Sequence, residues 1–286
     1  MRRRSARALA IALAIAAGAA SAVGAQRDRP DFHARYIALA AQRGLSDSAR
    51  LHRLFALDWE YTNVESPESA SFVGFPGLDD RWTDNSLAAI ARRRRELPDR
   101  RIVLRTIDRR RLGPADRLSY DVFSRGVDEA IDGARFPSEL LAVTQLEGPQ
   151  YLMNVLAYMP AGTVREYEHI LARLAGIPRV IDETRVLLDS GLSRGVTPPR
   201  ATLRDVPAQV ERLVPEDAMR SALLAPFASF PDSMAAADRA RLSAAAIRVY
   251  VDRVRPSYLA LADYLRHTRL QQTVWVWSRY KVDRMR

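Results

Sequence analysis

The 286-residue chain contains no cysteine, and among its 44 basic residues only Lys281 is a lysine. The absence of cysteine excludes disulfide scaffolds, cysteine nucleophiles, iron–sulfur clusters and zinc sites built on thiolates. The scarcity of lysine, together with the many alanines, indicates a GC-rich coding sequence more than selection for a basic surface. Hydrophobic residues make up 48% and charged residues 27%, which is typical of a globular protein of one large or two modest domains.

Uncompensated positive charge is also scarce in the body of the chain. The formal net charge is +10, but residues 1–25 carry +4 and residues 271–286 carry +3, so the segment between them is nearly balanced. The runs Arg92–Arg95 and Arg109–Arg111 have no interleaved aromatic residues on which bases could stack. We interpret Arg92–Arg95 as a solvated helix face and expect no nucleic-acid partner.

The N-terminus has the pattern of a secretory signal peptide. Four arginines between Arg2 and Arg7 precede the uncharged run Ala8–Gly24, and Val23-Gly24-Ala25 supplies the residues expected before a cleavage point. We therefore expect residues 1–25 to be removed and the mature chain to occupy the periplasm or the medium. The alternative is a membrane-anchoring helix, but the run is rich in Ala and Gly and shorter than the ~20 residues that span a bilayer. We expect no lipid attachment and no stable membrane insertion after cleavage.

Beyond Gln26, hydrophobic residues recur at spacings of three and four, and no period-two pattern competes. We predict an all-α fold, an irregular multi-helix array. Thr163-x-x-Glu166 forms a capping box that begins a helix, which we expect to end near Gly176. We expect further helices over 178–191 and from Pro198 to about Leu213.

Two other segments have one clearly apolar face. The first begins at Gly113-Pro114 and ends at Gly133, and its apolar residues are Tyr120, Phe123, Val127 and Ile131. The second is the longest periodic run, with a kink expected at Pro256. Its apolar residues are Ile247, Tyr250, Val251, Val254, Tyr258, Leu261 and Leu265.

The chain contains no complete catalytic or metal-binding motif. Two histidines on one helix reach one zinc ion when they are four residues apart, and His33, His52, His169 and His267 are all more widely separated. Glu166-x-x-His169 is half of a di-iron bundle motif without a second copy. We expect no metal ligands and no bound cofactor in this chain.

Gly191-Leu-Ser193-Arg-Gly195 matches the Gly-x-Ser-x-Gly nucleophile elbow. An elbow requires a strand before the serine and a helix after it. Here a predicted helix precedes the serine and Pro198-Pro199 follows it, which is typical of a helix end. We therefore predict no catalytic residue.

A series of short motifs follows in a characteristic order over about residues 45–270. They are Trp59-Glu60, Glu65-Ser-Pro-Glu68, Asp116-Arg-Leu-Ser-Tyr-Asp-Val-Phe123, Gln145-Leu-Glu-Gly-Pro149, Met159-Pro-Ala-Gly-Thr163, Tyr167-Glu168, Gly191 with Gly195, Pro198-Pro199, Pro226-Phe227, Phe230-Pro231 and Val254-Arg-Pro-Ser-Tyr258. In this order and spacing the chain resembles the N-terminal half of the bacterial domain-of-unknown-function 885 family of exported proteins.

The resemblance implies a helical, zinc-metallopeptidase-like protein whose metal is held by a His-Glu-x-x-His-like segment of the C-terminal half. Zinc is accordingly expected only in full-length members. We assign residues 26–270 to the N-terminal region of the family domain and 271–286 to an atypical tail. A frameshift, a premature stop and a natural short paralogue all remain open as explanations of the length.

Two function classes stay open. The chain is either the scaffold half of a peptidase-like enzyme, inactive alone and partnered by a missing C-terminal half, or a self-sufficient helical module that binds peptides. Gln145, Glu147 and Tyr151 are candidate contacts because they lie beside Gly148-Pro149 in an irregular stretch between helices, where binding groups are common. The alternative is that these three residues serve turn formation and one buried ring.

Overall fold

The structure is a computed structural model that describes residues 29–268. Across this range the protein is mainly helical, and its strand-like pairing is confined to one isolated antiparallel bridge between Thr144 and Glu147. The predicted all-α, irregular multi-helix array is confirmed. Within the described range no helix is long and apolar enough to span a bilayer. The proposed signal peptide and the atypical tail lie outside it.

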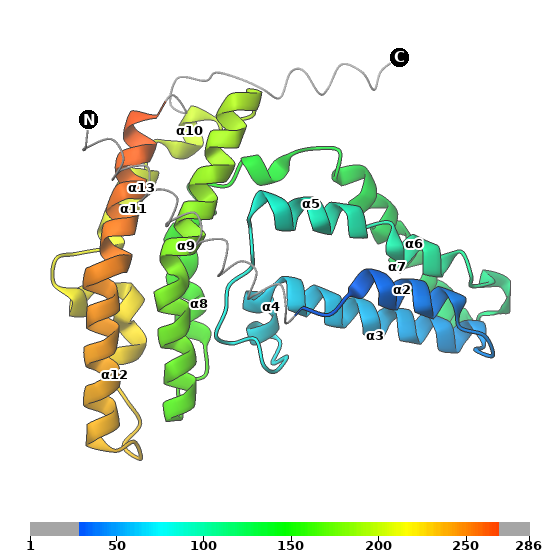
Figure 1. Ribbon diagram of the computed structural model, residues 1–286, viewed down its shortest axis with the longest axis horizontal. Helices are drawn as coiled ribbons and strands as arrows, with labels where there is room; N and C mark the ends of the chain where they lie inside the picture. The colour runs from blue at the N-terminus through cyan, green and yellow to red at the C-terminus, as the bar shows by residue number, and fades with distance from the viewer. Residues whose placement is uncertain (1–28, 269–286) are drawn as a thin grey trace, which may run out of the picture.

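The helices form two groups whose long axes run at a steep angle to each other (Figure 1). The first group contains α2 (Phe32–Ala41), α3 (Asp47–Glu65), α4 (Pro67–Phe72), α5 (Leu87–Glu96), α6 (Asp99–Leu104) and α7 (Pro114–Gly133). The second contains α8 (Leu152–Tyr158), α9 (Val164–Arg194), α10 (Arg200–Leu203), α11 (Val206–Leu213), α12 (Ala236–Val249) and α13 (Arg255–His267). Short 3₁₀ segments and one π-turn lie between them: η1 (Arg109–Arg111), η2 (Ser138–Leu140), η3 (Pro149–Tyr151), η4 (Ala218–Arg220), η5 (Ala222–Phe227) and the π-turn η6 (Tyr250–Val254).

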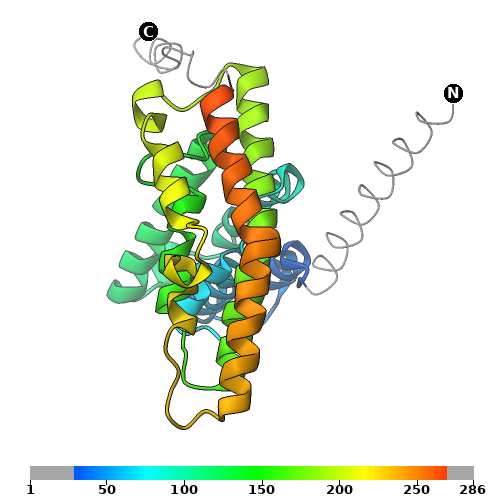
Figure 2. The ribbon, with the colours of Figure 1, turned by 90° about the vertical axis from the view of Figure 1, so that its left-hand side faces the viewer.

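The larger hydrophobic core lies in the second group, where α9 packs against α12 and α13, and α11 packs on α13. Figure 2 shows α12 and α13 as one long rod beside α9 and α11. The predicted apolar face of this rod is confirmed for most of its members. Tyr250, Val254, Tyr258, Leu261 and Leu265 are buried.

Val251 departs from that face, because its side chain is 49% exposed. The cause is the π-turn η6, in which the Arg255 amide donates to the Tyr250 carbonyl five residues earlier. Pro256 has no amide hydrogen, so the irregularity expected there takes the form of a π-turn directly before it.

Helix α9 begins at the predicted capping box, in which Thr163 and Glu166 bond each other's backbone amides. The predicted end near Gly176 and the separate helix from Pro178 to Gly191 are wrong, because α9 continues through both residues to Arg194. Leu174, Ile177 and Ile181 are buried in one uninterrupted core. This packing outweighs the bond lost at the proline.

The remaining predicted helices differ less from the structure. Helix α7 spans the expected range, with Val127 buried and Tyr120, Phe123 and Ile131 partly buried against the first group. The helix expected from Pro198 to about Leu213 is divided into α10 and α11. Pro207, in the first turn of α11, explains the division, since it has no amide hydrogen to donate to the carbonyl of Leu203, the last residue of α10.

The interpretation of Arg92–Arg95 as a solvated helix face is wrong for three of the four residues. Arg92 and Arg93 donate to Glu65 Oε2 at 2.8 and 3.3 Å, and Arg94 donates to Glu139 Oε2 at 2.7 Å. The Glu65 side chain, 9% exposed, also accepts from Arg29. The arginines of α5 therefore neutralise carboxylates that folding removes from water.

The two helix groups meet where the segment before α5 crosses α9. Trp82, which is buried, donates from Nε1 to the Arg173 carbonyl at 2.7 Å. Gly176 leaves room for its indole ring, since a Cβ there would lie 2.9 Å from Trp82 Cδ1. In return the fully buried Arg173 side chain donates to the carbonyls of Pro67, Leu78 and Arg81. Burial lowers the pKa of Arg173, although the charges of Glu68, Asp79 and Asp80 favour its cationic form.

Trp82→Phe removes the indole N–H, so the buried Arg173 carbonyl loses its hydrogen bond from Trp82. We expect the free energy of unfolding to fall by about 1–3 kcal/mol, measured by urea denaturation. Trp59→Phe is the matched control, because the Trp59 side chain is 52% exposed. Equal effects of the two substitutions would contradict a specific role of Trp82 at the junction.

Within the first helix group, a histidine–aspartate pair joins α2 to α6. His33 Nδ1 lies 3.0 Å from both carboxylate oxygens of Asp99, and Asp99 is buried while the His33 ring faces solvent. The hydrogen bond and the negative charge of Asp99 raise the pKa of His33 above its ordinary value of 6.5. The pair therefore favours the protonated imidazole in the folded chain.

The stability that this pair contributes should be fully present below pH 6.5 and should be lost as the pH rises through the raised pKa of folded His33. An NMR titration of the His33 ring protons should give a midpoint above 6.5, and Asp99→Asn should move that midpoint down. An unchanged midpoint in the variant would show that Asp99 is not the cause.

Candidate functional site

An apolar pocket opens on the second helix group, between the end of α8 and η5. Its volume is about 490 Å³. Its walls come from two segments some seventy positions apart in sequence, and their residues are Leu156, Ala157, Met159, Ala161, Tyr167, Ala225, Pro226, Ser229, Phe230 and Pro231.

Prolines and caps fix the shape of this pocket. Helix α8 ends before Met159-Pro160, and the chain turns into the Thr163 cap of α9 within a few residues. Between the two walls, the Tyr167 hydroxyl donates to the Ser229 carbonyl at 2.9 Å. The Tyr167 and Phe230 rings lie 4.6 Å apart between centroids. The walls are therefore held by aromatic packing and one side-chain to backbone bond.

The lining contains no charged side chain, and its hydroxyl groups are those of Tyr167 and Ser229. Its volume lies in the range of about 300–1,000 Å³ found for small-molecule and side-chain sites. The chemistry that it supports is the burial of an apolar group, with a hydroxyl available at one side. It offers no carboxylate pair or imidazole for acid–base catalysis.

The candidate contacts Gln145, Glu147 and Tyr151 lie at the opposite end of α8, and none of them lines the pocket. They belong to a tight turn in which the Thr144 amide donates to the Glu147 carbonyl at 2.8 Å. The Tyr151 hydroxyl donates to the Gln145 carbonyl at 2.6 Å, and the ring is half-buried. The hydroxyl of Tyr151 therefore holds the turn. The exposed side chains of Gln145 and Glu147 remain predicted contacts.

Zinc does not fit the described residues. No three His, Cys, Asp or Glu side chains in residues 29–268 are grouped so that they could hold a metal ion. His33, His52 and His267 each pair with a single aspartate. The half-motif at His169 is used otherwise, because the Glu166 carboxylate accepts from the Gly162 and Thr163 amides at 2.8 Å. Those bonds, first of all the one from Gly162, lower the pKa of Glu166.

Ser193 lies in the last turn of α9, where its hydroxyl donates to the Ser190 carbonyl at 2.9 Å. Gly195 follows with φ of 68°, the left-handed conformation that commonly ends a helix. The prediction that Gly191-x-Ser193-x-Gly195 is a helix end is confirmed.

The pocket residues were present in the sequence as parts of the motifs Met159–Thr163, Pro226-Phe227 and Phe230-Pro231, but not as a candidate site. Their signal is prolines and aromatics that fall outside the helical period. That signal predicts irregular chain in two places. It does not show that the two places meet, which depends on the packing of α8 and η5.

The model of the family described as "Bacterial protein of unknown function (DUF885)" matches residues 67–278. This range contains both walls of the apolar pocket, the turn at Thr144–Glu147 and the Arg173 junction. A search of curated proteins gave no match. On the extent of the family match, the chain belongs to the DUF885 family of bacterial proteins.

Proposed function

We propose that this chain is an exported, metallopeptidase-like helical scaffold that binds an apolar segment of a polypeptide in its apolar pocket and does not itself catalyse hydrolysis. The mature chain begins at Gln26 in this proposal. The observation that carries it is the convergence of two distant motif segments on one uncharged pocket.

The absence of catalysis is supported by how the acidic groups are used. Glu65 and Glu96, both nearly buried, are paired with Arg29. Glu183 accepts from the Asn85 amide and from Arg179. These carboxylates hold the fold together, so they are not available to activate water beside a metal.

Binding of a polypeptide segment is supported by the size and composition of the pocket. One bulky apolar side chain can be buried against Leu156, Met159 and Phe230, while the Ser229 side chain at the exposed edge can bond a neighbouring backbone group. Affinity then comes from one buried anchor, as in many protein interfaces.

An interaction module that binds through the turn at Thr144–Glu147 is a second candidate. The observation that favours it is Leu146, whose side chain is 74% exposed at the tip. The turn is held from within by Gln150, which donates to the Thr144 and Glu147 carbonyls. A rigid turn presents an exposed leucine at little conformational cost.

Ala225→Trp should fill the pocket and weaken the capture of apolar peptides from a mixed library by at least about tenfold, since burial of one apolar side chain contributes about 1.5–3 kcal/mol. Ala228→Trp is the matched control, because Ala228 is also exposed in this segment but does not line the pocket. Equal retention by both variants would exclude the pocket as the binding site, and loss with Leu146→Ser would favour the turn.

The purified mature chain should bind no stoichiometric zinc and should not hydrolyse peptides, since its described residues supply no set of ligands. Bound metal per chain is measured after dialysis against zinc, and cleavage is assayed with and without a chelator. One zinc per chain, with chelator-sensitive cleavage that His169→Ala or His267→Ala abolishes, would contradict the non-catalytic part of the proposal.

A further inference from the structure

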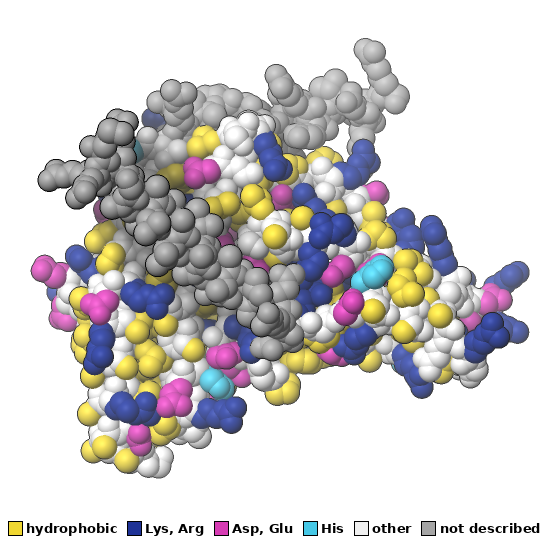
Figure 3. Space-filling view, viewed as in Figure 1, with side chains coloured by type: hydrophobic (Ala, Val, Ile, Leu, Met, Phe, Trp, Pro, Cys, Tyr) yellow, Lys and Arg dark blue, Asp and Glu magenta, His cyan; other side chains and the backbone are white. Residues whose placement is uncertain are grey.

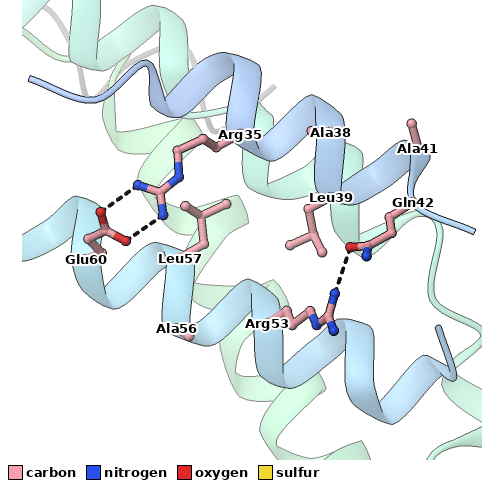
Figure 4. Close-up of a pocket in the computed structure, with 9 residues that line it drawn as sticks. All are labelled: Arg35, Ala38, Leu39, Ala41, Gln42, Arg53, Ala56, Leu57 and Glu60. Carbon is pink, nitrogen blue, oxygen red and sulfur yellow. Dashed lines mark hydrogen bonds and ion pairs between the residues drawn. The ribbon is translucent and has the colours of Figure 1, made fainter.

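A groove of about 590 Å³ runs between α2 and α3, on the first helix group and far from the pocket used above. Figure 4 shows Leu39 and Leu57 meeting in the middle of the groove, with Ala38 and Ala56 on its two sides. Because the alanine side chains are small, they leave space above Leu39 and Leu57 between the two helices. In the space-filling view, hydrophobic side chains gather over α2 (Figure 3).

The two ends of the groove differ in charge. At one end Arg35 forms a two-bond pair with Glu60, at 2.6 Å for each bond, which neutralises both groups. At the other end Arg53 donates to the neutral side-chain amide of Gln42 at 2.9 Å. Within the described part of the chain, Arg53 forms no ion pair with a carboxylate. The groove therefore has one neutralised end and one cationic end.

A second arginine adds to the positive charge of that end. Arg50, 9% exposed, donates to the carbonyls of Leu39 and Ala40 in the last turn of α2 and of Gln42 directly after it. These carbonyls carry only partial negative charge, and no carboxylate accompanies them. Arg53 can thus direct its remaining donors toward an anion while Arg50 holds the helix end in place.

We propose that this groove, defined by Arg53 at its cationic end and by Leu39 and Leu57 on its floor, binds a linear aliphatic carboxylate. The carboxylate bonds the Arg53 guanidinium, and the hydrocarbon chain lies along the floor toward the Arg35–Glu60 pair. From Arg35 to Gln42 the helix advances about 10 Å, so a chain of medium length spans the groove.

The composition of the groove favours a hydrocarbon over a peptide. Between the two polar ends, the floor and walls consist of alanine and leucine side chains, and the α3 wall belongs to the interior of a helix whose backbone groups bond one another. A peptide laid there would bury amide groups without partners, which costs free energy for each group. A hydrocarbon chain requires no partners and gains from contact with the floor.

The test measures binding of octanoate to the mature chain by saturation-transfer NMR, with dissociation constants from titration. Arg53→Gln should weaken binding by about tenfold, because it removes a charge-assisted bond. Ala56→Trp should close the groove and weaken binding at least as much. Ala34→Trp, an exposed alanine of α2 outside the groove, is the matched control and should bind like the unchanged chain.

Two further ligands separate the alternatives. Octan-1-ol should bind more weakly than octanoate and should not respond to Arg53→Gln. A leucine tripeptide with a free carboxylate should bind more weakly than octanoate. The proposal is overturned if octanoate binding is undetectable, if it is insensitive to Ala56→Trp or to Arg53→Gln, or if the tripeptide binds more tightly. None of these results depends on the Ala225 pocket, so the two proposals fail separately.

Discussion

The structure depends on Arg173, a buried arginine of helix α9. Arg173 bonds three carbonyls of the segment that leads from α4 toward α5, and its own carbonyl accepts from the Trp82 indole. Leu78 and Arg81 lie in irregular chain and Pro67 is the first residue of α4, so one side chain bonds the backbone at three separate points of this segment. Because Arg173 bonds all three, it fixes the segment against α9 where the two helix groups, each with its own hydrophobic cluster, meet.

The same use of arginine recurs elsewhere in the described part of the chain. Arg50 bonds three carbonyls at the end of α2, and Arg29 bridges Glu65 to Glu96. A guanidinium offers five donors in a planar fork, whereas an ammonium offers three on a flexible stem. Most of the positive charge in the interior is therefore matched by carbonyls or carboxylates. Arg53 differs, because it donates to a neutral side-chain amide at the protein surface.

Local patterns in the sequence predicted what local physics decides. The capping box at Thr163, the extent of α7 and the helix end at Gly195 follow from neighbouring residues, and all are confirmed. The errors occur where a distant segment intervenes. Gly176 suggests a helix end in the sequence, but in the structure it leaves room for the Trp82 ring. Arg92 was predicted to face solvent, but it donates to Glu65 of α3. The apolar pocket was missed for the same reason, since its walls are separate in sequence and meet only by packing.

The two proposed binding places have different physical origins, and this decides how each can fail. The pocket is walled mainly by irregular chain whose shape is set by prolines and by the Tyr167 bond to Ser229, so its form depends on the larger hydrophobic core of the second helix group. The groove is a consequence of small side chains on two paired helices, so it persists as long as α2 and α3 pack. A substitution at the Arg173 junction should therefore disturb both through global stability, whereas tryptophan at Ala225 or at Ala56 should close one and leave the other open.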